Sequence, residues 1–459
     1  MYRLLLVIAV LAGCKGKESD SGSARAASSK ATAADPGAEA CAMAKPHGPL
    51  AWFEDDYPGA LACAKAKNLP LVVDLWAPWC HTCLSMKTTV FTDPSLAKDA
   101  SRFVFVALDT DREDNAAAVA KYPLSAWPTF YVVGPDESVL ARFVGAASLA
   151  QWKAFLDDGA KAVAGVDGAA KHLLAAERAI AVKDLATADT ELTAAIEAAP
   201  AGWVRKPDAL TSLIHTKRKR KDAEGCLATA EKYLDETGTA ASATDFVGIS
   251  LDCAKDAADP TRAAVFRERA ITRLQKLLDD PAAQLSADDR SDAMVYLRDV
   301  LEAVGRKPEA INLAEKQRQF LEDQIEKARS PLAAMTFNFQ LAGAYIYLGR
   351  PLEAVPALEA SAKALPHEYD PAARLGWVYQ EAGQLPEAAT WTDKAIALAY
   401  GPRKASLLSR RADIAAKQGD ATLEKKLRTE IVALWESLPP GQANPDALAK
   451  AKDALAKLP

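Results

Sequence analysis

The 459-residue sequence lacks the residue patterns that several kinds of cofactor site require. Cys80 and Cys83 form its only C-x-x-C pair and no H-x-x-x-H pair exists, so the four ligands of a structural zinc site are missing at the usual spacing. Leu84 stands where covalent haem attachment would need a histidine. The net charge of −5 provides no global attraction for nucleic acid. We therefore expect no metal, no other cofactor and no nucleic-acid partner.

The N-terminus has the pattern of an export signal. A positively charged start precedes an apolar run over residues 4–11, which is far too short to span a bilayer. The run ends in Leu-Ala-Gly-Cys at residues 11–14, which resembles a bacterial lipobox. This resemblance implies removal of a signal peptide (residues 1–13), lipidation of Cys14 and a membrane anchor. The alternative is an ordinary signal peptide with a fortuitous cysteine, and in either case the chain leaves the cytoplasm.

The resemblance also predicts a location in the bacterial cell envelope, facing the periplasm, where disulfides persist. Lys15 follows the lipobox cysteine instead of aspartate, which favours the outer over the inner membrane slightly. Residues 15–40 are rich in Ser, Ala, Gly, Lys and Asp without an aromatic residue, so they cannot bury enough apolar surface to fold alone. We expect residues 14–44 to be the lipidated cysteine and a flexible tether, with a reach of roughly 30 Å.

The remaining chain is long enough for two domains, which we place at 45–160 and 165–459. In the first, an apolar strand (residues 71–75) leads through a short turn to Cys80 and Cys83, where a helix should begin. A thiolate at a helix N-terminus is stabilised by the dipole and by free N–H groups, so it becomes nucleophilic. The second cysteine, one turn later, can attack a mixed disulfide and release the substrate. A purely structural short-loop disulfide is the alternative.

Apolar runs at residues 103–108, 129–133 and 139–144 predict further strands, the last two joined by a Gly-Pro-Asp-Glu turn. Helical spacing at 57–67, 115–122 and 148–156, with Ser148 as a cap, predicts helices around them, and the helix after the cysteines should continue through Val90. The order helix–strand–helix–strand–helix–strand–strand–helix, together with the cysteine motif, resembles the thioredoxin superfamily over the whole of 45–160. The expected fold class is an α/β thioredoxin fold.

This resemblance assigns roles to residues around the cysteine pair. Cys80 would attack, Cys83 would resolve, and Asp74 would be a buried general base whose pKa desolvation raises, unless it only satisfies local hydrogen bonds. The Trp-Pro-Thr run at 127–129 matches the family's cis-proline loop, although many thioredoxins carry a small aliphatic residue before the proline. The expected substrate-binding residues are Trp79, His81, Trp127, Pro128 and Thr129.

Two local features bear on the direction of electron flow. The run Phe-Thr-Asp-Pro at 91–94 resembles the C-terminal periplasmic domain of the membrane electron transporter DsbD, which favours a reductase or an electron relay. A positive His81 beside Cys80 would favour the thiolate and hence an oxidant. The resemblance implies cysteine-containing envelope proteins as partners and a membrane electron donor of the DsbD type.

Residues 165–459 are helical in pattern and contain a repeat. Leu, Tyr, Gly and Ala at 341, 345, 349 and 354 recur 34 residues later, and this spacing resembles tetratricopeptide repeats. Weaker copies precede them at 170–200, 207–236 and 297–310, and a degenerate one lies around Gly419. We expect an all-α solenoid whose surface recruits proteins or peptides, or which is only a rigid spacer.

Four cysteines lie outside these motifs. We expect Cys41–Cys63 and Cys226–Cys253 to be structural disulfides, with free thiols or an auxiliary redox pair as alternatives for the first. Five consecutive basic residues (217–221) predict a solvated helix end, or else a membrane-phosphate contact.

The sequence thus predicts a lipid-anchored thiol:disulfide oxidoreductase of the cell envelope. The alternative function is a scaffold lipoprotein whose repeat domain does the work, with the thioredoxin-like domain as a binding platform.

Overall fold

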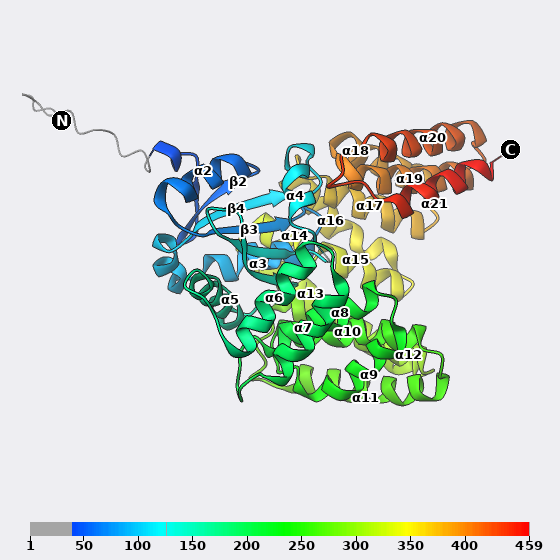
Figure 1. Cartoon of the computed structure of the whole chain (residues 1–459). Coiled ribbons are helices and arrows are strands. Elements are labelled where there is room, and N and C mark those ends of the chain that lie inside the picture. Colours follow the sequence, from blue (N-terminus) through cyan, green and yellow to red (C-terminus); the bar gives the residue numbers. More distant parts are fainter. Residues whose placement is uncertain (1–38, 125, 459) are drawn as a thin grey trace, which may run out of the picture. The chain divides into compact units, whose positions relative to one another are not determined.

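The computed structural model describes residues 39–124 and 126–458, shown in Figure 1. The predicted signal peptide, the lipidation site Cys14 and the tether up to residue 38 lie outside this part. Within the described ranges, no helix combines the length and the apolar character needed to cross a membrane.

A six-stranded sheet forms the first domain, in the order β1-β2-β4-β3-β5-β6. β2, β4 and β3 run parallel to one another, while β1, β5 and β6 are antiparallel to their neighbours. The strands are β1 (Lys45–His47), β2 (Leu50–Glu54), β3 (Leu71–Trp76), β4 (Val104–Asp109), β5 (Thr129–Val133) and β6 (Val139–Val144). β3 pairs with β4 along one edge and with β5 along the other, and its residues are buried from Leu71 to Leu75, as its continuous apolar run predicts.

Helices cover both faces of this sheet. Val72 belongs to a core shared with α3 and α5, whereas the next residue, Val73, belongs to a core shared with α2 and α4. The alternation follows from the two-residue period of a strand. The helices are α2 (Tyr57–Lys67), α3 (His81–Thr88), α4 (Ala116–Lys121) and α5 (Leu149–Ala162), with 3₁₀ turns at Val90–Thr92, Pro94–Ser101 and Glu113–Asn115. The predicted thioredoxin fold class is confirmed.

Three local predictions differ from the structure. β1 and β2 were not expected, because three and five residues are too few to show a clear period. α3 ends at Thr88 and does not continue through Val90. Thr88 and Thr89 donate side-chain hydrogen bonds to the carbonyls of Leu84 and Ser85, at 2.8 and 2.6 Å, and such bonds compete with helix continuation. α5 runs beyond residue 156 to Ala162, and Ser148 caps it in a capping box with Gln151.

The second domain is all-α. Its helices are α6 (Gly168–Ala181), α7 (Leu185–Glu197), α8 (Lys206–Lys219), α9 (Ala223–Tyr233), α10 (Ala241–Asp256), α11 (Pro260–Asp279), α12 (Ala287–Ala303), α13 (Lys307–Lys327), α14 (Pro331–Met335), α15 (Asn338–Tyr347), α16 (Val355–Ala364), α17 (Tyr369–Glu381), α18 (Leu385–Leu398), α19 (Gly401–Lys417), α20 (Ala421–Ser437) and α21 (Pro445–Ala456).

The 34-residue repeat corresponds to successive helix pairs. Leu341 on α15 and Leu375 on α17 are fully buried at equivalent places. Gly349 and Gly383 form the turns that follow these helices, with φ of 73° and 75°, a region that suits glycine. The tetratricopeptide-like, all-α character of this region is therefore confirmed by its own helix pairs.

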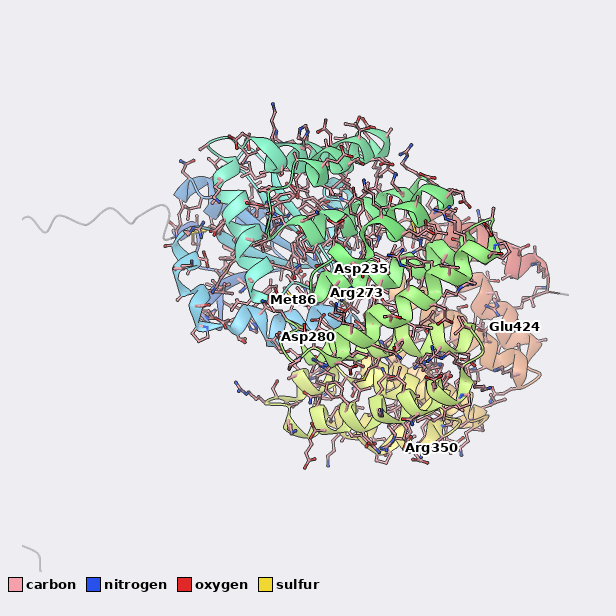
Figure 2. The ribbon with its side chains drawn as sticks, turned by 90° about the horizontal axis from the view of Figure 1, so that it is seen from below. Met86, Asp235, Arg273, Asp280, Arg350 and Glu424 are labelled. Atoms are coloured by element: carbon pink, nitrogen blue, oxygen red, sulfur yellow. A yellow bond between two sulfur atoms is a disulfide. The ribbon has the colours of Figure 1, made fainter. Side chains whose placement is uncertain are left out.

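Polar contacts fasten the turns of the helical domain. Arg273 of α11 lies near Asp235 and Asp280 (Figure 2) and donates to Thr237 Oγ1 at 3.1 Å. In the basic run, Lys217 and Arg220 both pair with Asp189 of α7, and Arg218 pairs with Asp252. Most of this run therefore joins neighbouring helices within the domain.

Two disulfides lie away from the redox motif. Cys41 is joined to Cys63 of α2, across 22 residues, and Cys226 of α9 is joined to Cys253 of α10. The first attaches the segment before β1 to the sheet domain, and the second links two adjacent helices.

Candidate active site

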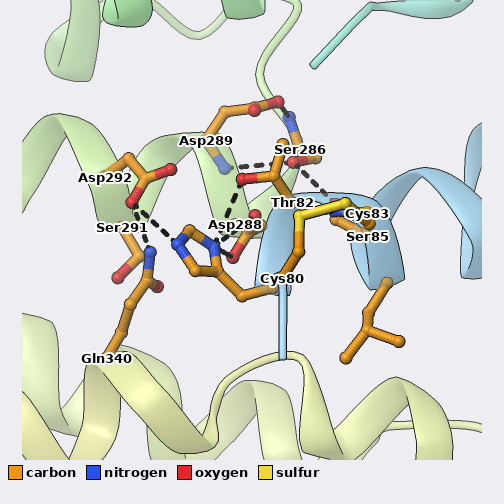
Figure 3. Close-up of polar contacts among 12 residues, drawn as sticks. Cys80, Thr82, Cys83, Ser85, Ser286, Asp288, Asp289, Ser291, Asp292 and Gln340 are labelled. Carbon is orange, nitrogen blue, oxygen red and sulfur yellow. Dashed lines mark hydrogen bonds and ion pairs between the residues drawn. A yellow bond between two sulfur atoms is a disulfide. The ribbon is translucent and has the colours of Figure 1, made fainter. Parts of the chain in front are cut away.

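The centre of the site is a disulfide between Cys80 and Cys83 at the start of α3 (Figure 3). Cys80 is the N-cap of the helix, and the Cys83 N–H donates to Cys80 Sγ at 3.0 Å. This donor and the positive end of the helix would stabilise a thiolate on Cys80 after reduction. The side chains are only 5 % and 4 % exposed, respectively. The arrangement places a nucleophile and a resolving thiol one helical turn apart.

Asp74 lies in the middle of β3, the strand that leads into the cysteine turn. It is 6 % exposed, and its Oδ1 has no hydrogen-bond partner. Burial raises the pKa of Asp74 to about 8, although nearby Lys87 acts in the opposite direction. Because a free thiol has a pKa of about 8.5, such a carboxylate is well matched to accept a proton from a thiol.

The loop before β5 contains a cis peptide bond between Trp127 and Pro128. The Trp127 ring packs edge-to-face on Trp79, with 5.0 Å between centroids, and its Nε1 donates to Thr110 Oγ1 at 2.8 Å. Both tryptophans pack against Cys80 and Cys83. Thr129 was expected to bind substrate, but its side chain is fully buried and donates to the carbonyl of Ala126. Thr129 therefore shapes the loop without presenting a side chain to substrate.

His81 faces the helical domain. Its Nδ1 donates to Asp288 of α12 at 2.9 Å, and its Nε2 lies 3.9 Å from Asp292; Figure 3 labels the two carboxylates. The His81 ring also stacks on Phe339. Burial by itself lowers the pKa of His81, but the two carboxylates outweigh this effect and raise it to about 10. His81 is thus held as an imidazolium beside Cys80.

No sequence pattern indicated that two carboxylates, Asp288 and Asp292, contact His81. Asp288 belongs to an acidic first turn like that of many helices, and Asp292 lies one turn later. Nothing local connects either residue with a histidine about 200 positions earlier, 207 in the case of Asp288. The ligand atoms of the three residues lie within 4.8 Å of one another, close enough for a metal ion in principle. However, both ring nitrogens face carboxylates, which suits a doubly protonated ring better than a metal-bound one.

The helical domain also contacts the other edge of the motif. Arg374 of α17 donates to the Trp79 carbonyl at 3.4 Å, and Tyr400 donates to Asp109. The Gln442 amide donates to the Thr110 carbonyl at 3.0 Å. A Cβ added at Gly145, after β6, would meet Asp245 of α10 at 2.2 Å. The helical domain therefore contacts the sheet domain at three places: the cysteine turn, the cis-proline region and the loop after β6.

A cavity of about 730 Å³ remains between the two domains beside the tryptophans. Trp79, Thr110, Asp111 and Trp127 line it from the sheet domain. The Trp79 Nε1 donates to Asp111 Oδ2 at 2.8 Å, and burial raises the pKa of Asp111 to about 6. The far wall comes from helices α8, α19, α20 and the segment before α21.

Comparison with known proteins agrees with this description of the first domain. A thioredoxin-like family model matches residues 52–135, which run from within β2 through β5 and include both motif cysteines and the cis-proline. The chain is 30 % identical over 82 residues to the thiol:disulfide interchange protein DsbD of Pseudomonas fluorescens, covering 17 % of this chain and 14 % of that protein. It is 35 % identical over 72 residues to thioredoxin of Pyropia yezoensis, covering 16 % of this chain and 64 % of that protein.

Among solved structures, a tetratricopeptide repeat protein from Parabacteroides merdae is 13 % identical, with a TM-score of 0.40, covering 63 % of this chain and 99 % of that one. YrrB, a tetratricopeptide protein described as having an unusual peptide-binding site, is 15 % identical with a TM-score of 0.25, covering 44 % and 90 %.

The first domain is thus thioredoxin-like, with the cysteine spacing of a thiol–disulfide oxidoreductase. It is followed by a tetratricopeptide-like helical domain.

Proposed function

We propose that this protein is a thiol:disulfide oxidoreductase of the bacterial cell envelope, anchored through Cys14 and acting as a reductase or electron relay. The observation that carries the proposal is the Cys80–Cys83 disulfide at the N-terminus of α3, with the Cys83 N–H on Cys80 Sγ and the cis-proline loop beside it. A structural disulfide would need neither the unpartnered carboxylate of Asp74 nor this loop.

In the reducing direction, the Cys80 thiolate attacks one sulfur of a substrate disulfide and forms a mixed disulfide, releasing the other substrate sulfur as a thiolate. Asp74 accepts the proton of Cys83, and the Cys83 thiolate then attacks Cys80 Sγ. The substrate leaves as a dithiol and the protein becomes the Cys80–Cys83 disulfide. A membrane donor of the DsbD type would return two electrons.

The charges around His81 bear on this direction. A lone imidazolium beside Cys80 would stabilise the thiolate and favour an oxidant. Here Asp288 and Asp292 accompany the imidazolium, so the cluster as a whole brings no net positive charge to the cysteine. Together with the likeness to DsbD, this balance supports the reducing direction.

Two features support the envelope location. The first is the lipobox-like sequence that ends at Cys14. The second is the presence of two disulfides outside the redox motif, which suits an oxidising compartment. A Cys14→Ala variant expressed in a Gram-negative host should lose labelling by a radioactive fatty acid. Labelling that persists in this variant would contradict lipidation at Cys14.

The decisive measurement is the reduction potential of the Cys80–Cys83 pair in the mature chain without its lipid. Equilibration against glutathione buffers, followed by thiol trapping, gives this value. A potential of roughly −270 mV would support a reductase, whereas one of roughly −120 mV would mark an oxidant and overturn the direction proposed.

One observation favours a role for the helical domain beyond recruitment. It touches the motif on both edges, through His81 on one side and Trp79 on the other. We propose that it also controls which substrates reach the dithiol.

A further inference from the structure

Arg403 lies within electrostatic reach of Asp111 but makes no hydrogen bond with it. It lies in the first turn of α19, and its guanidinium is 5.3 Å from the centroid of the Trp79 ring. Its Nε is buried without a hydrogen-bond partner, and the described residues offer this side chain neither an ion pair nor a hydrogen bond. The residue as a whole is half-buried, so Nε is the one donor that burial leaves without an acceptor, and a group that accepted its hydrogen bond would be favoured.

The position of Arg403 at the start of its helix also favours a bound anion. The first turn of α19 contains no acidic residue, and no side chain caps it. A cation at a helix N-terminus is disfavoured by the macrodipole, whereas an anion there is stabilised. The helix end and the guanidinium therefore both favour a negatively charged group at this place.

The cavity beside Trp79 provides the space for such a group. Arg403 lines it on one side, and Lys183 and Lys219 line it on another. Lys219 belongs to the basic run 217–221, in which other residues form ion pairs between helices. The Lys219 Nζ instead donates a hydrogen bond to the Leu124 carbonyl, at 3.4 Å. Asp111 is the single acid in the lining, and it already accepts a hydrogen bond from Trp79. Three cations thus face a cavity with one carboxylate.

Two tryptophans are shared between this cavity and the surroundings of the disulfide. Trp79 and Trp127 line the cavity and also pack against Cys80 and Cys83. On the opposite edge of the motif, His81 is covered by α12. The two cysteines are only 5 % and 4 % exposed, and the cavity volume of about 730 Å³ lies within the usual range of small-molecule pockets, about 300–1,000 Å³.

We propose that this cavity binds the carboxylate groups of a low-molecular-weight disulfide, with Arg403 as the main anchor. The inference rests on the proposed oxidoreductase function and adds its substrate class, a small acidic disulfide. The reduced protein donates two electrons: Cys80 forms a mixed disulfide and one small thiolate departs. Cys83 then closes the Cys80–Cys83 disulfide and the second thiolate departs, each thiolate being protonated from solvent.

The test uses the full mature chain, reduced beforehand, and follows its oxidation by stopped-flow tryptophan fluorescence. Three disulfides of different charge are compared: glutathione disulfide (anionic), 2-hydroxyethyl disulfide (neutral) and cystamine (cationic). Each rate is divided by the rate of the same disulfide with free dithiothreitol. We expect this relative rate to be about tenfold higher for the anionic disulfide than for the neutral one, because only the anionic one can accept charge-assisted hydrogen bonds from Arg403. This preference should weaken as salt rises.

Arg403→Gln should reduce the anionic-to-neutral rate ratio about tenfold, and Arg403→Lys should retain part of it. The matched control is Arg269→Gln, which changes a partly exposed arginine of α11 outside the cavity. Should Arg403→Gln fold poorly by circular dichroism, Lys219→Gln and the salt dependence of the unmodified chain decide the question.

Equal relative rates for the three disulfides, or an unchanged ratio in Arg403→Gln, would overturn the inference while leaving the oxidoreductase function intact. A chain that reacts with none of the disulfides would instead contradict the proposed function itself. A faster reaction with a ten-residue acidic peptide disulfide than with glutathione disulfide would show that the occupant is a peptide and would refute the small-molecule assignment.

Discussion

His81, the residue after the first motif cysteine, donates a 2.9 Å hydrogen bond to Asp288 at the start of α12. The two residues belong to different domains and lie 207 positions apart. The contact makes the ionisation of a residue beside Cys80 depend on the helical domain. It links the domain that resembles a binding module with the chemistry of the domain that carries the dithiol.

Asp288→Asn should lower the pKa of His81 from about 10 towards its ordinary value of about 6.5, because the closest carboxylate is lost. NMR titration of the His81 ring protons measures this shift. Glu191→Gln is the matched control, because it removes the carboxylate that binds His172 and should leave His81 unaffected. An unchanged His81 titration in Asp288→Asn would mean that this ion pair does not form in solution.

The same ion pair predicts a pH dependence of stability. A histidine whose pKa is raised in the folded state contributes stability that is fully present below about pH 6.5 and is lost as the pH rises through about 10. Urea unfolding between pH 6 and pH 10 should therefore show a decline that is shallower in Asp288→Asn. Parallel curves for the two proteins would contradict the assignment of this decline to His81.

Asp74→Asn should stabilise the protein above pH 8. Folding raises the pKa of Asp74 to about 8, so ionisation of Asp74 costs stability progressively from about pH 4 to pH 8. Removing this charge should raise the free energy of unfolding at pH 9 by on the order of a few kcal/mol, and it should slow the release of mixed disulfides at pH 7. Asp99→Asn is the contrast, because Asp99 is equally buried but bonded to Arg102, and its loss should destabilise the fold.

Cys80→Ser should abolish reduction of every disulfide tested, while its thermal unfolding midpoint stays within a few degrees of the parent in its reduced form. Cys83→Ser should instead accumulate mixed disulfides with substrates, which mass spectrometry can identify. If Cys80→Ser retained full biological activity in the native host, the scaffold function of the helical domain would be favoured over the enzymatic one.

Two glycines of the repeat region should respond in opposite ways to alanine. Gly383→Ala places a side chain at φ of 75° and should destabilise the domain by about 1 kcal/mol. Gly343→Ala lies within α15, where the new methyl group would meet Trp377 at an ordinary 3.8 Å, and should stabilise it by about 0.5–1 kcal/mol. Chemical denaturation measures both, and shifts of the same sign would contradict the assigned turn.

The sequence by itself determined the local features of this protein. The strand–turn–helix context of Cys80, the turn residue Gly349 and the buried Leu375 are set by short-range periodicity and by backbone preferences. Such signals depend only on neighbours within a few positions, so they can be recognised without knowing which other elements pack against the segment. The short strands β1 and β2 were not predicted, because three to five residues are too few to show a periodic pattern.

Only the tertiary structure decided which polar side chains meet the redox motif. Asp288 and Arg403 look like ordinary charged residues on helix surfaces, and a solvated helix face has the same pattern as one that faces another domain. Their partners, His81 and Trp79, lie hundreds of residues earlier in the chain. The cavity beside the dithiol and the charge of its walls arise from how the helices pack against the sheet domain, a relationship that no local pattern encodes.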